Sequence, residues 1–147
     1  MIEFKPYEIP LTVPYQWSKG THLTRKGLIV RIQTENHVGW GEAILPPDMP
    51  FDEQEQMELA KKLVSGLDVQ DENFIERLDE RKPPNPLRHG ITTAWFCVQA
   101  SLEGKKLADY LLSHFGINRS PETEIPYNAL ITEKSVYGPK EDVLIEG

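Results

Sequence analysis

The sequence predicts an α+β fold in which an antiparallel β-meander precedes a small bundle of helices. Apolar residues alternate over the first third of the chain, which is typical of half-buried strands. From residue 52 onward they recur at helical spacing. The 147 residues, of which 39% are apolar and 27% charged, are enough for one folded domain with a core of its own.

The first strand alternates in two phases. Ile2 and Phe4 share one face, whereas Ile9 and Val13 have the opposite parity. Because one extra residue reverses the facing of everything after it, we expect a β-bulge or a bend near Pro6–Tyr7.

The second and third strands follow a loop predicted over residues 14–20. A turn at residues 35–37 joins the two strands into a hairpin. In the third strand Gly39 and Gly41 share a face opposite that of Trp40. Since glycine weakens a strand, two on one face predict a close approach by another backbone. The second strand has one apolar face, formed by Leu28, Val30 and Ile32.

Helices are predicted for the middle of the chain. Asp52 followed by Glu55 is a capping-box-like start for the first helix. A second helix is expected over residues 72–81, and the proline-rich residues 83–86 stop it. A third begins at about His89.

Glycines mark the ends of the last two helices. Gly104 falls where the third helix ends or bends, and Gly116 is a C-terminal stop for the fourth. The side chains expected to face inward are Met57, Ala60, Leu63, Val64 and Leu67, then Phe74, Ile75 and Leu78, then Ile91, Ala94, Trp95, Val98 and Leu102, and finally Leu107, Tyr110 and Leu111.

Composition argues against several functions. The net charge of −7 disfavours a nucleic-acid partner, and no apolar stretch is long enough for a membrane span. The N-terminus lacks the features of a signal peptide, so we expect a cytoplasmic protein. Cys97 is the only cysteine and is interpreted as a packed, inert thiol. Scattered histidines and the lack of nucleotide or serine-nucleophile motifs leave no complete active site.

Three stretches resemble one family. Residues 24–31, a short turn and then Gly39–Ala43 resemble the N-terminal capping domain of the enolase superfamily, in its muconate-lactonizing subgroup. Residues 100–105 are similar to that family's helical Ala-x-x-Asp-Leu-x-Gly-Lys region, with Ser101 where an Asp is usual. Residues 125–131 resemble the strand that opens the catalytic barrel.

The resemblance implies a division of the chain and a reaction. Residues 1–118 would be the capping domain, and residues 119–147 a linker with the first strand of a (β/α) barrel whose other strands are absent from the sequence. Members of the family abstract a proton next to a carboxylate, using Mg²⁺ and lysines on later barrel strands. We therefore expect no catalytic residue and no metal ligand in this chain, and no activity from it alone.

The resemblance leaves several activities open. Residues 25–30 and 128–131 are most similar to o-succinylbenzoate synthases of menaquinone biosynthesis. Dipeptide epimerases, N-acylamino-acid racemases and muconate cycloisomerases share most of the pattern, and a stand-alone interaction module is a further alternative. The expected partners are a small carboxylate substrate, the C-terminal barrel domain of the same protein and further copies in a homo-oligomer.

The resemblance also implies where substrate is covered. Two capping-domain loops close such active sites, here residues 13–21 and 44–50. Aromatic side chains, donors and a cation suit a small dianionic substrate, and prolines limit the conformations of the second loop. The alternative is that Trp17 packs on its own domain and Lys19 is a solvated loop cation. The candidate substrate-binding residues are Tyr15, Gln16, Trp17, Ser18 and Lys19, then Pro46, Pro47, Asp48 and Met49, and on the barrel strand Asn128, Leu130 and Thr132.

Overall fold

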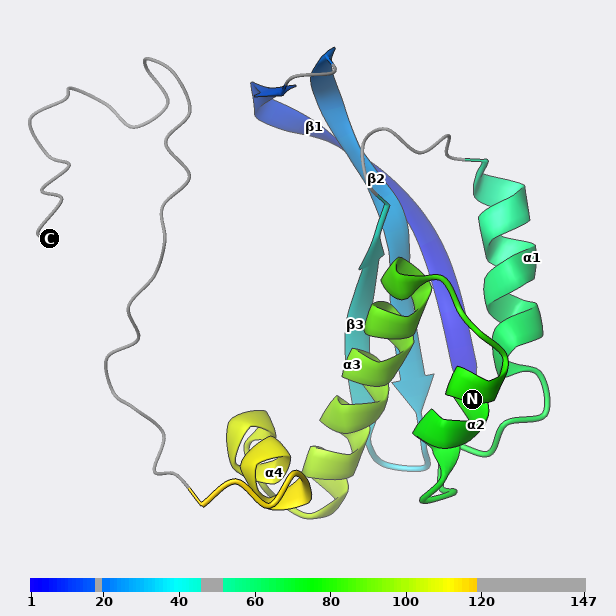
Figure 1. Ribbon diagram of the computed structural model, residues 1–147, viewed down its shortest axis with the longest axis vertical. Coiled ribbons are helices and arrows are strands. Elements are labelled where there is room, and N and C mark those ends of the chain that lie inside the picture. The colour runs from blue at the N-terminus through cyan, green and yellow to red at the C-terminus, as the bar shows by residue number, and fades with distance from the viewer. Residues whose placement is uncertain (18–19, 46–51, 119–147) are drawn as a thin grey trace, which may run out of the picture.

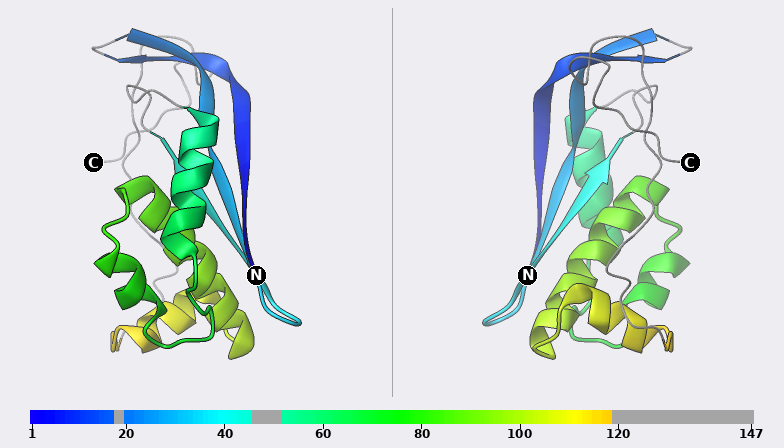
Figure 2. Two further views of the ribbon diagram at one scale, coloured as in Figure 1. Left: turned by 90° about the vertical axis from the view of Figure 1, so that its right-hand side faces the viewer. Right: turned by 90° about the vertical axis from the view of Figure 1, so that its left-hand side faces the viewer.

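A three-stranded antiparallel sheet and the helices that follow it make up the computed structural model, which describes residues 1–17, 20–45 and 52–118. The strands are β1 (Ile2–Trp17), β2 (Gly20–Gln33) and β3 (Val38–Ile44), in the order β1-β2-β3. The helices α1 (Glu53–Val64), α2 (Phe74–Glu80), α3 (Asn85–Leu102) and α4 (Leu107–His114) gather on one face of the sheet (Figures 1 and 2). The predicted α+β class is confirmed.

Residues 119–147 lie outside the described residues. The predicted linker and barrel strand, and the division of the chain at residue 118, therefore stay predictions.

The core lies between the inner face of the sheet and the helices. The Trp95 indole N–H donates to the carbonyl oxygen of Val69 at 2.9 Å, and the Trp95 ring stacks on Phe74 with 5.7 Å between ring centroids. These contacts join α3 to α2 and to the segment between α1 and α2. The buried residues include Leu28, Val30 and Ile32 of β2, as predicted, and also Ala60, Leu63, Phe74, Leu78, Leu87, Ile91, Ala94, Trp95 and Val98.

The two glycines of β3 allow α3 to lie directly on the sheet. A Cβ atom on Gly39 would lie 2.0 Å from the Ala94 carbonyl oxygen, and one on Gly41 would lie 1.9 Å from the Gly90 carbonyl oxygen. Such distances are impossible for non-bonded atoms, so only glycine fits at either position. The predicted close approach by another backbone is confirmed, and the backbone is that of α3.

The irregularity in β1 lies further along the strand than predicted. Pairing with β2 is regular from Ile2↔Ile32 to Pro10↔Thr24, and the register then shifts before Tyr15. The prediction of a bulge near residues 6–7 is therefore wrong. Ile9 differs in parity from Ile2 and Phe4 because its side chain points to the open face of the sheet, where it is exposed.

The loop predicted over residues 14–20 is also wrong. β1 continues to Trp17 and β2 starts at Gly20, so most of this segment is strand. Pairing between the two strands outweighs its turn-like composition of proline, glycine and polar residues.

β1 lies at an edge of the sheet and carries three prolines, Pro6, Pro10 and Pro14. Proline has no backbone N–H and is confined within sheets mainly to edge strands. The edge position therefore explains how so proline-rich a segment forms a strand.

The helix ends show both agreement and correction. The Asp52 side chain accepts a hydrogen bond from the Glu55 N–H at 2.9 Å, which confirms the predicted cap of α1. Helix α3 begins at Asn85, about one turn before His89. Pro86 lies in its first turn, where the N–H that proline lacks has no partner in a helix, so the proline-rich segment opens this helix. Gly104 and Gly116 both have a φ of +64°, in agreement with the predicted helix ends.

Asp52→Ala is expected to lower the free energy of unfolding by about 1 kcal/mol, because the first turn of α1 loses its side-chain acceptor. Glu53→Ala is the matched control, since it also removes an acidic side chain from the start of the helix but leaves the cap. Urea unfolding followed by circular dichroism would measure both variants. Equal losses would show that charge near the helix N-terminus, and not the cap, is responsible.

Candidate functional site

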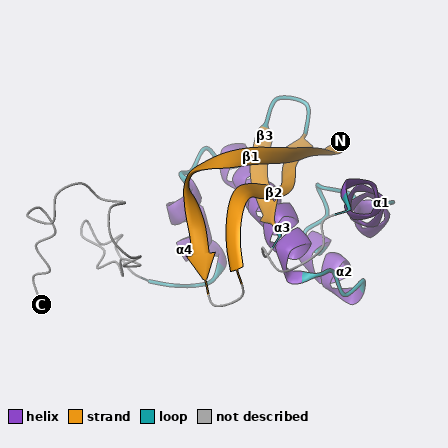
Figure 3. Ribbon diagram, turned by 90° about the horizontal axis from the view of Figure 1, so that it is seen from above, coloured by secondary structure: helices purple, strands orange, loops and turns teal. Residues whose placement is uncertain are grey.

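The hairpin of β1 and β2 extends past the third strand. β3 pairs with β2 only as far as Gly27↔Ile44. Residues 20–26 of β2, at about 3.3 Å per residue, therefore reach roughly 20 Å further. We call this extension, residues 8–17 and 20–26, the β1–β2 arm. The arm projects beyond the helices (Figure 1), and β1 bends sharply where the arm begins (Figure 3).

The β1–β2 arm carries exposed apolar side chains. Leu23 is 64% exposed and Tyr15 is 40% exposed, and Val13 and Gln16 are exposed as well. Trp17 is the last residue of β1. Apolar surface of this kind on a projecting segment is suited to covering a ligand or meeting another domain.

The end of β3 lies at the base of the β1–β2 arm. The Leu45 N–H donates to the Lys26 carbonyl oxygen at 3.4 Å, and α1 starts at this end of the sheet after Asp52 (Figure 1). The structure therefore brings the described ends of the two predicted loops to one end of the sheet. The other candidates, namely Ser18, Lys19, Pro46, Pro47, Asp48, Met49, Asn128, Leu130 and Thr132, lie outside the described residues and stay predictions.

A hydrogen bond joins the two outer strands across β2. The Tyr7 hydroxyl on β1 donates to Oε1 of Glu42 on β3. Tyr7 is in register with Gly27, where a Cβ atom would lie 2.9 Å from the tyrosine ring. Burial, together with the hydrogen bond to Glu42, raises the pKa of Tyr7 to about 12, so the phenol keeps its proton and donates at neutral pH. This contact was not predicted from the sequence. The feature that could have indicated it is Gly27, a glycine within a strand.

Ser101, which the resemblance aligns with an Asp, lies at the far end of the molecule from the β1–β2 arm. Its hydroxyl is 2.7 Å from Nδ1 of His37, in the turn between β2 and β3. Both groups are exposed. The pair joins α3 to that turn and is a structural contact.

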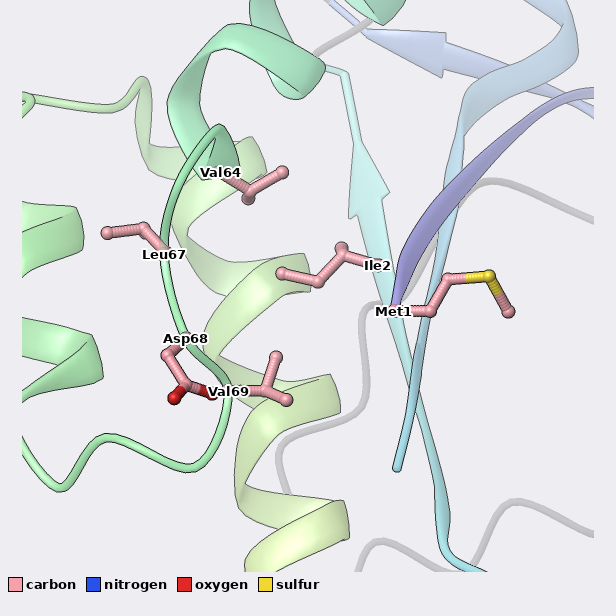
Figure 4. Close-up of a pocket in the computed structure, with 6 residues that line it drawn as sticks. All are labelled: Met1, Ile2, Val64, Leu67, Asp68 and Val69. Atoms are coloured by element: carbon pink, nitrogen blue, oxygen red, sulfur yellow. The ribbon is translucent and has the colours of Figure 1, made fainter. Parts of the chain in front are cut away.

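A shallow hollow of about 270 Å³ lies near the N-terminus, also away from the arm (Figure 4). Its one carboxylate, that of Asp68, accepts a hydrogen bond from the Gln70 N–H. Without convergent polar groups the hollow is not a candidate site. It is lined by Met1, Ile2, Val64, Leu67, Asp68 and Val69.

The described residues do not fit a metal centre. Within residues 1–17, 20–45 and 52–118, no three His, Cys, Asp or Glu side chains gather as ligands. In the same ranges, no helix is long and apolar enough to cross a membrane.

Comparison with known proteins finds structural relatives only. No family model matches the sequence, and no curated protein matches it. A mandelate racemase/muconate lactonizing protein from Herpetosiphon aurantiacus is similar in structure, with a TM-score of 0.53 and 20% identity over 78% of this chain and 31% of its own. An enolase family member from Agrobacterium tumefaciens with homology to dipeptide epimerases is also similar in structure, with a TM-score of 0.62. The match has 16% identity and covers 76% of this chain and 34% of that structure's chain.

The chain shares its fold with the part of these two structures that it covers. The chain spans about a third of the length of these two structures, with 31% and 34% covered. An o-succinylbenzoate synthase from Thermosynechococcus elongatus BP-1, complexed with Mg in the active site, matches with 24% identity over 66% of this chain and 29% of its own. Its TM-score is 0.45. At these identities the likeness establishes a shared fold, and neither a role nor a reaction.

Proposed function

We propose that this chain is the capping domain of a Mg²⁺-dependent enzyme of the enolase superfamily. The observation that carries the proposal is the β1–β2 arm, which holds exposed Tyr15 and Leu23 at the same end of the sheet as the exit of β3. The Agrobacterium tumefaciens structure with this fold contains bound sodium and L-Ala-L-Glu with an ordered loop. The arm of this chain would cover a small carboxylate substrate at the mouth of a barrel domain of the same protein.

The reaction we propose is proton abstraction next to a carboxylate, of the o-succinylbenzoate synthase type. Dipeptide epimerisation, N-acylamino-acid racemisation and muconate cycloisomerisation are the alternatives within the superfamily. Mg²⁺, held by barrel residues, would supply charge stabilisation. The capping residues would exclude water and orient the substrate, so the chain alone is expected to be inactive.

The coding sequence beyond Gly147 tests the proposal directly. A Lys-x-Lys pair followed by spaced Asp and Glu residues supports the enzyme. A stop codon, with no barrel encoded nearby, favours the second candidate, a stand-alone interaction module. That candidate draws its support from the buried core that the described residues form among themselves.

In the full-length enzyme, Trp17→Ala and Met49→Ala, made separately, are expected to lower kcat/KM about tenfold or more with little change in Tm. Residues that cover a substrate contribute to binding the transition state and little to folding. Trp40→Ala is the matched control, because Trp40 is 56% exposed on the open face of the sheet. The proposed capping role would be wrong if both test variants kept their kcat/KM on every accepted substrate. It would also be wrong if they lost activity only because they unfold.

A further inference from the structure

We propose that Tyr7 and Glu42 form a clamp that positions the β1–β2 arm. The two residues belong to the outer strands of the sheet, and their side chains meet over the central strand. The purpose of the clamp rests on the proposed capping function, whereas its existence and its mechanical effect do not.

The clamp lies where the sheet changes from three strands to two. Tyr7 pairs with Gly27, and Gly27 pairs with Ile44, the last residue of β3. Beyond this row only β1 and β2 continue. A two-stranded ribbon is marginally stable alone and twists more than a wider sheet. The orientation of the arm is therefore decided at this row.

Gly27 makes the clamp possible. A Cβ atom at this buried position would lie 2.5 Å from the Ala43 carbonyl oxygen and 2.9 Å from both Cε1 and Oη of Tyr7. The tyrosine ring therefore occupies the space over β2 that a side chain would fill. An aromatic ring over a strand glycine also shields the backbone there.

The neighbouring ion pair contributes less to fixing the arm. Lys26 and Glu8 approach to 3.2 Å, but their side chains are 40% and 52% exposed. Exposed pairs contribute little because water screens them. The Tyr7–Glu42 contact is partly buried and has a carboxylate acceptor, and hydrogen bonds to ionised groups are stronger than neutral ones. It also spans all three strands, so it fixes β1 relative to β3.

Residue-resolved amide hydrogen exchange on this chain tests the clamp. Tyr7→Phe removes only the hydroxyl, and we expect exchange of residues 11–16 and 21–26 to accelerate about tenfold, the usual effect of losing one such hydrogen bond. Exchange of the amides in the buried middle of α3 should stay unchanged. Glu3→Ala is the matched control, because it removes the acceptor of the 2.6 Å contact with Arg31 between β1 and β2, far from the arm.

A second pair of variants separates the hydrogen bond from the packing of the tyrosine. Glu42→Gln keeps an acceptor oxygen and should hold arm exchange near the wild-type rate, whereas Glu42→Ala should reproduce Tyr7→Phe. This pair also decides the matter if Tyr7→Phe does not fold. Equal arm exchange in Glu42→Ala and the wild type would overturn the proposal, and so would an acceleration spread evenly over the arm and α3. The measurement requires neither a barrel domain nor catalytic turnover. A result against the clamp would therefore say nothing against the proposed function.

Discussion

Gly41→Ala is expected to lower the free energy of unfolding by about 3 kcal/mol or more, the upper range for forcing extra volume into a packed core. The added methyl group would lie 1.9 Å from the Gly90 carbonyl oxygen and 3.0 Å from the Ala94 nitrogen. Both are backbone atoms of α3, so the clash is relieved only if the whole helix moves off the sheet. Urea unfolding followed by circular dichroism would measure the loss.

Gly66→Ala is the matched control for this substitution. No heavy atom lies within 4 Å of a Cβ at Gly66, but its φ is +71°. The control is therefore expected to cost about 1 kcal/mol, from backbone conformation alone. If Gly41→Ala costs no more than Gly66→Ala, contact between β3 and α3 is not what requires glycine.

Phe74→Ala is expected to cost about 3–5 kcal/mol, the usual range for removing a buried phenylalanine ring. Phe74 is fully buried at the start of α2, and its ring is nearly parallel to that of Trp95, at an interplanar angle of 2°. The cavity would open between α2 and α3, where the Arg88–Asp79 pair also joins the two helices. Thermal unfolding should show a large fall in Tm.

Phe115→Ala is the control with the same chemistry. Phe115 is 60% exposed, beyond the end of α4, and its loss is expected to change stability by about 0.5 kcal/mol or less. A Phe115→Ala loss as large as that of Phe74→Ala would show that burial in this core does not decide the cost.

Local chemistry allowed several elements to be predicted. The glycine pair of β3 indicated a backbone contact because two glycines on one face of a strand leave room for another backbone to approach closely. Asp52 and Glu55 located the start of α1 for a similarly local reason, since the cap satisfies N–H groups within a single turn. The apolar face of β2 followed from alternation alone.

Elements that depend on pairing between distant residues were not located correctly. The change of phase in β1 indicated an irregularity, but its position depends on register with β2, which alternation does not fix. Residues 15–17 resemble a turn in composition and become strand because β2 pairs with them. The start of α3 was placed too late for a different reason: the prolines were interpreted only as the stop of the second helix, whereas Pro86 also lies in the first turn of α3.

The candidate site was predictable only in outline. The resemblance indicated two loops, and the structure brings their described ends to one end of the sheet. Tyr7 and Glu42 are 35 positions apart in sequence, and their contact depends on a tyrosine crossing a glycine of an intervening strand. No spacing rule within a single strand reveals such a pair.

The prolines of β1 have a consequence for the behaviour of the protein in concentrated solution. An unpaired strand edge is a template for aggregation, because its free N–H and C=O groups can hydrogen-bond to a strand of another molecule. Pro6, Pro10 and Pro14 remove donors at regular intervals along this edge. An incoming strand therefore cannot form an uninterrupted ladder with β1, and fibril-like stacking through this edge is disfavoured even though the hairpin is long and exposed.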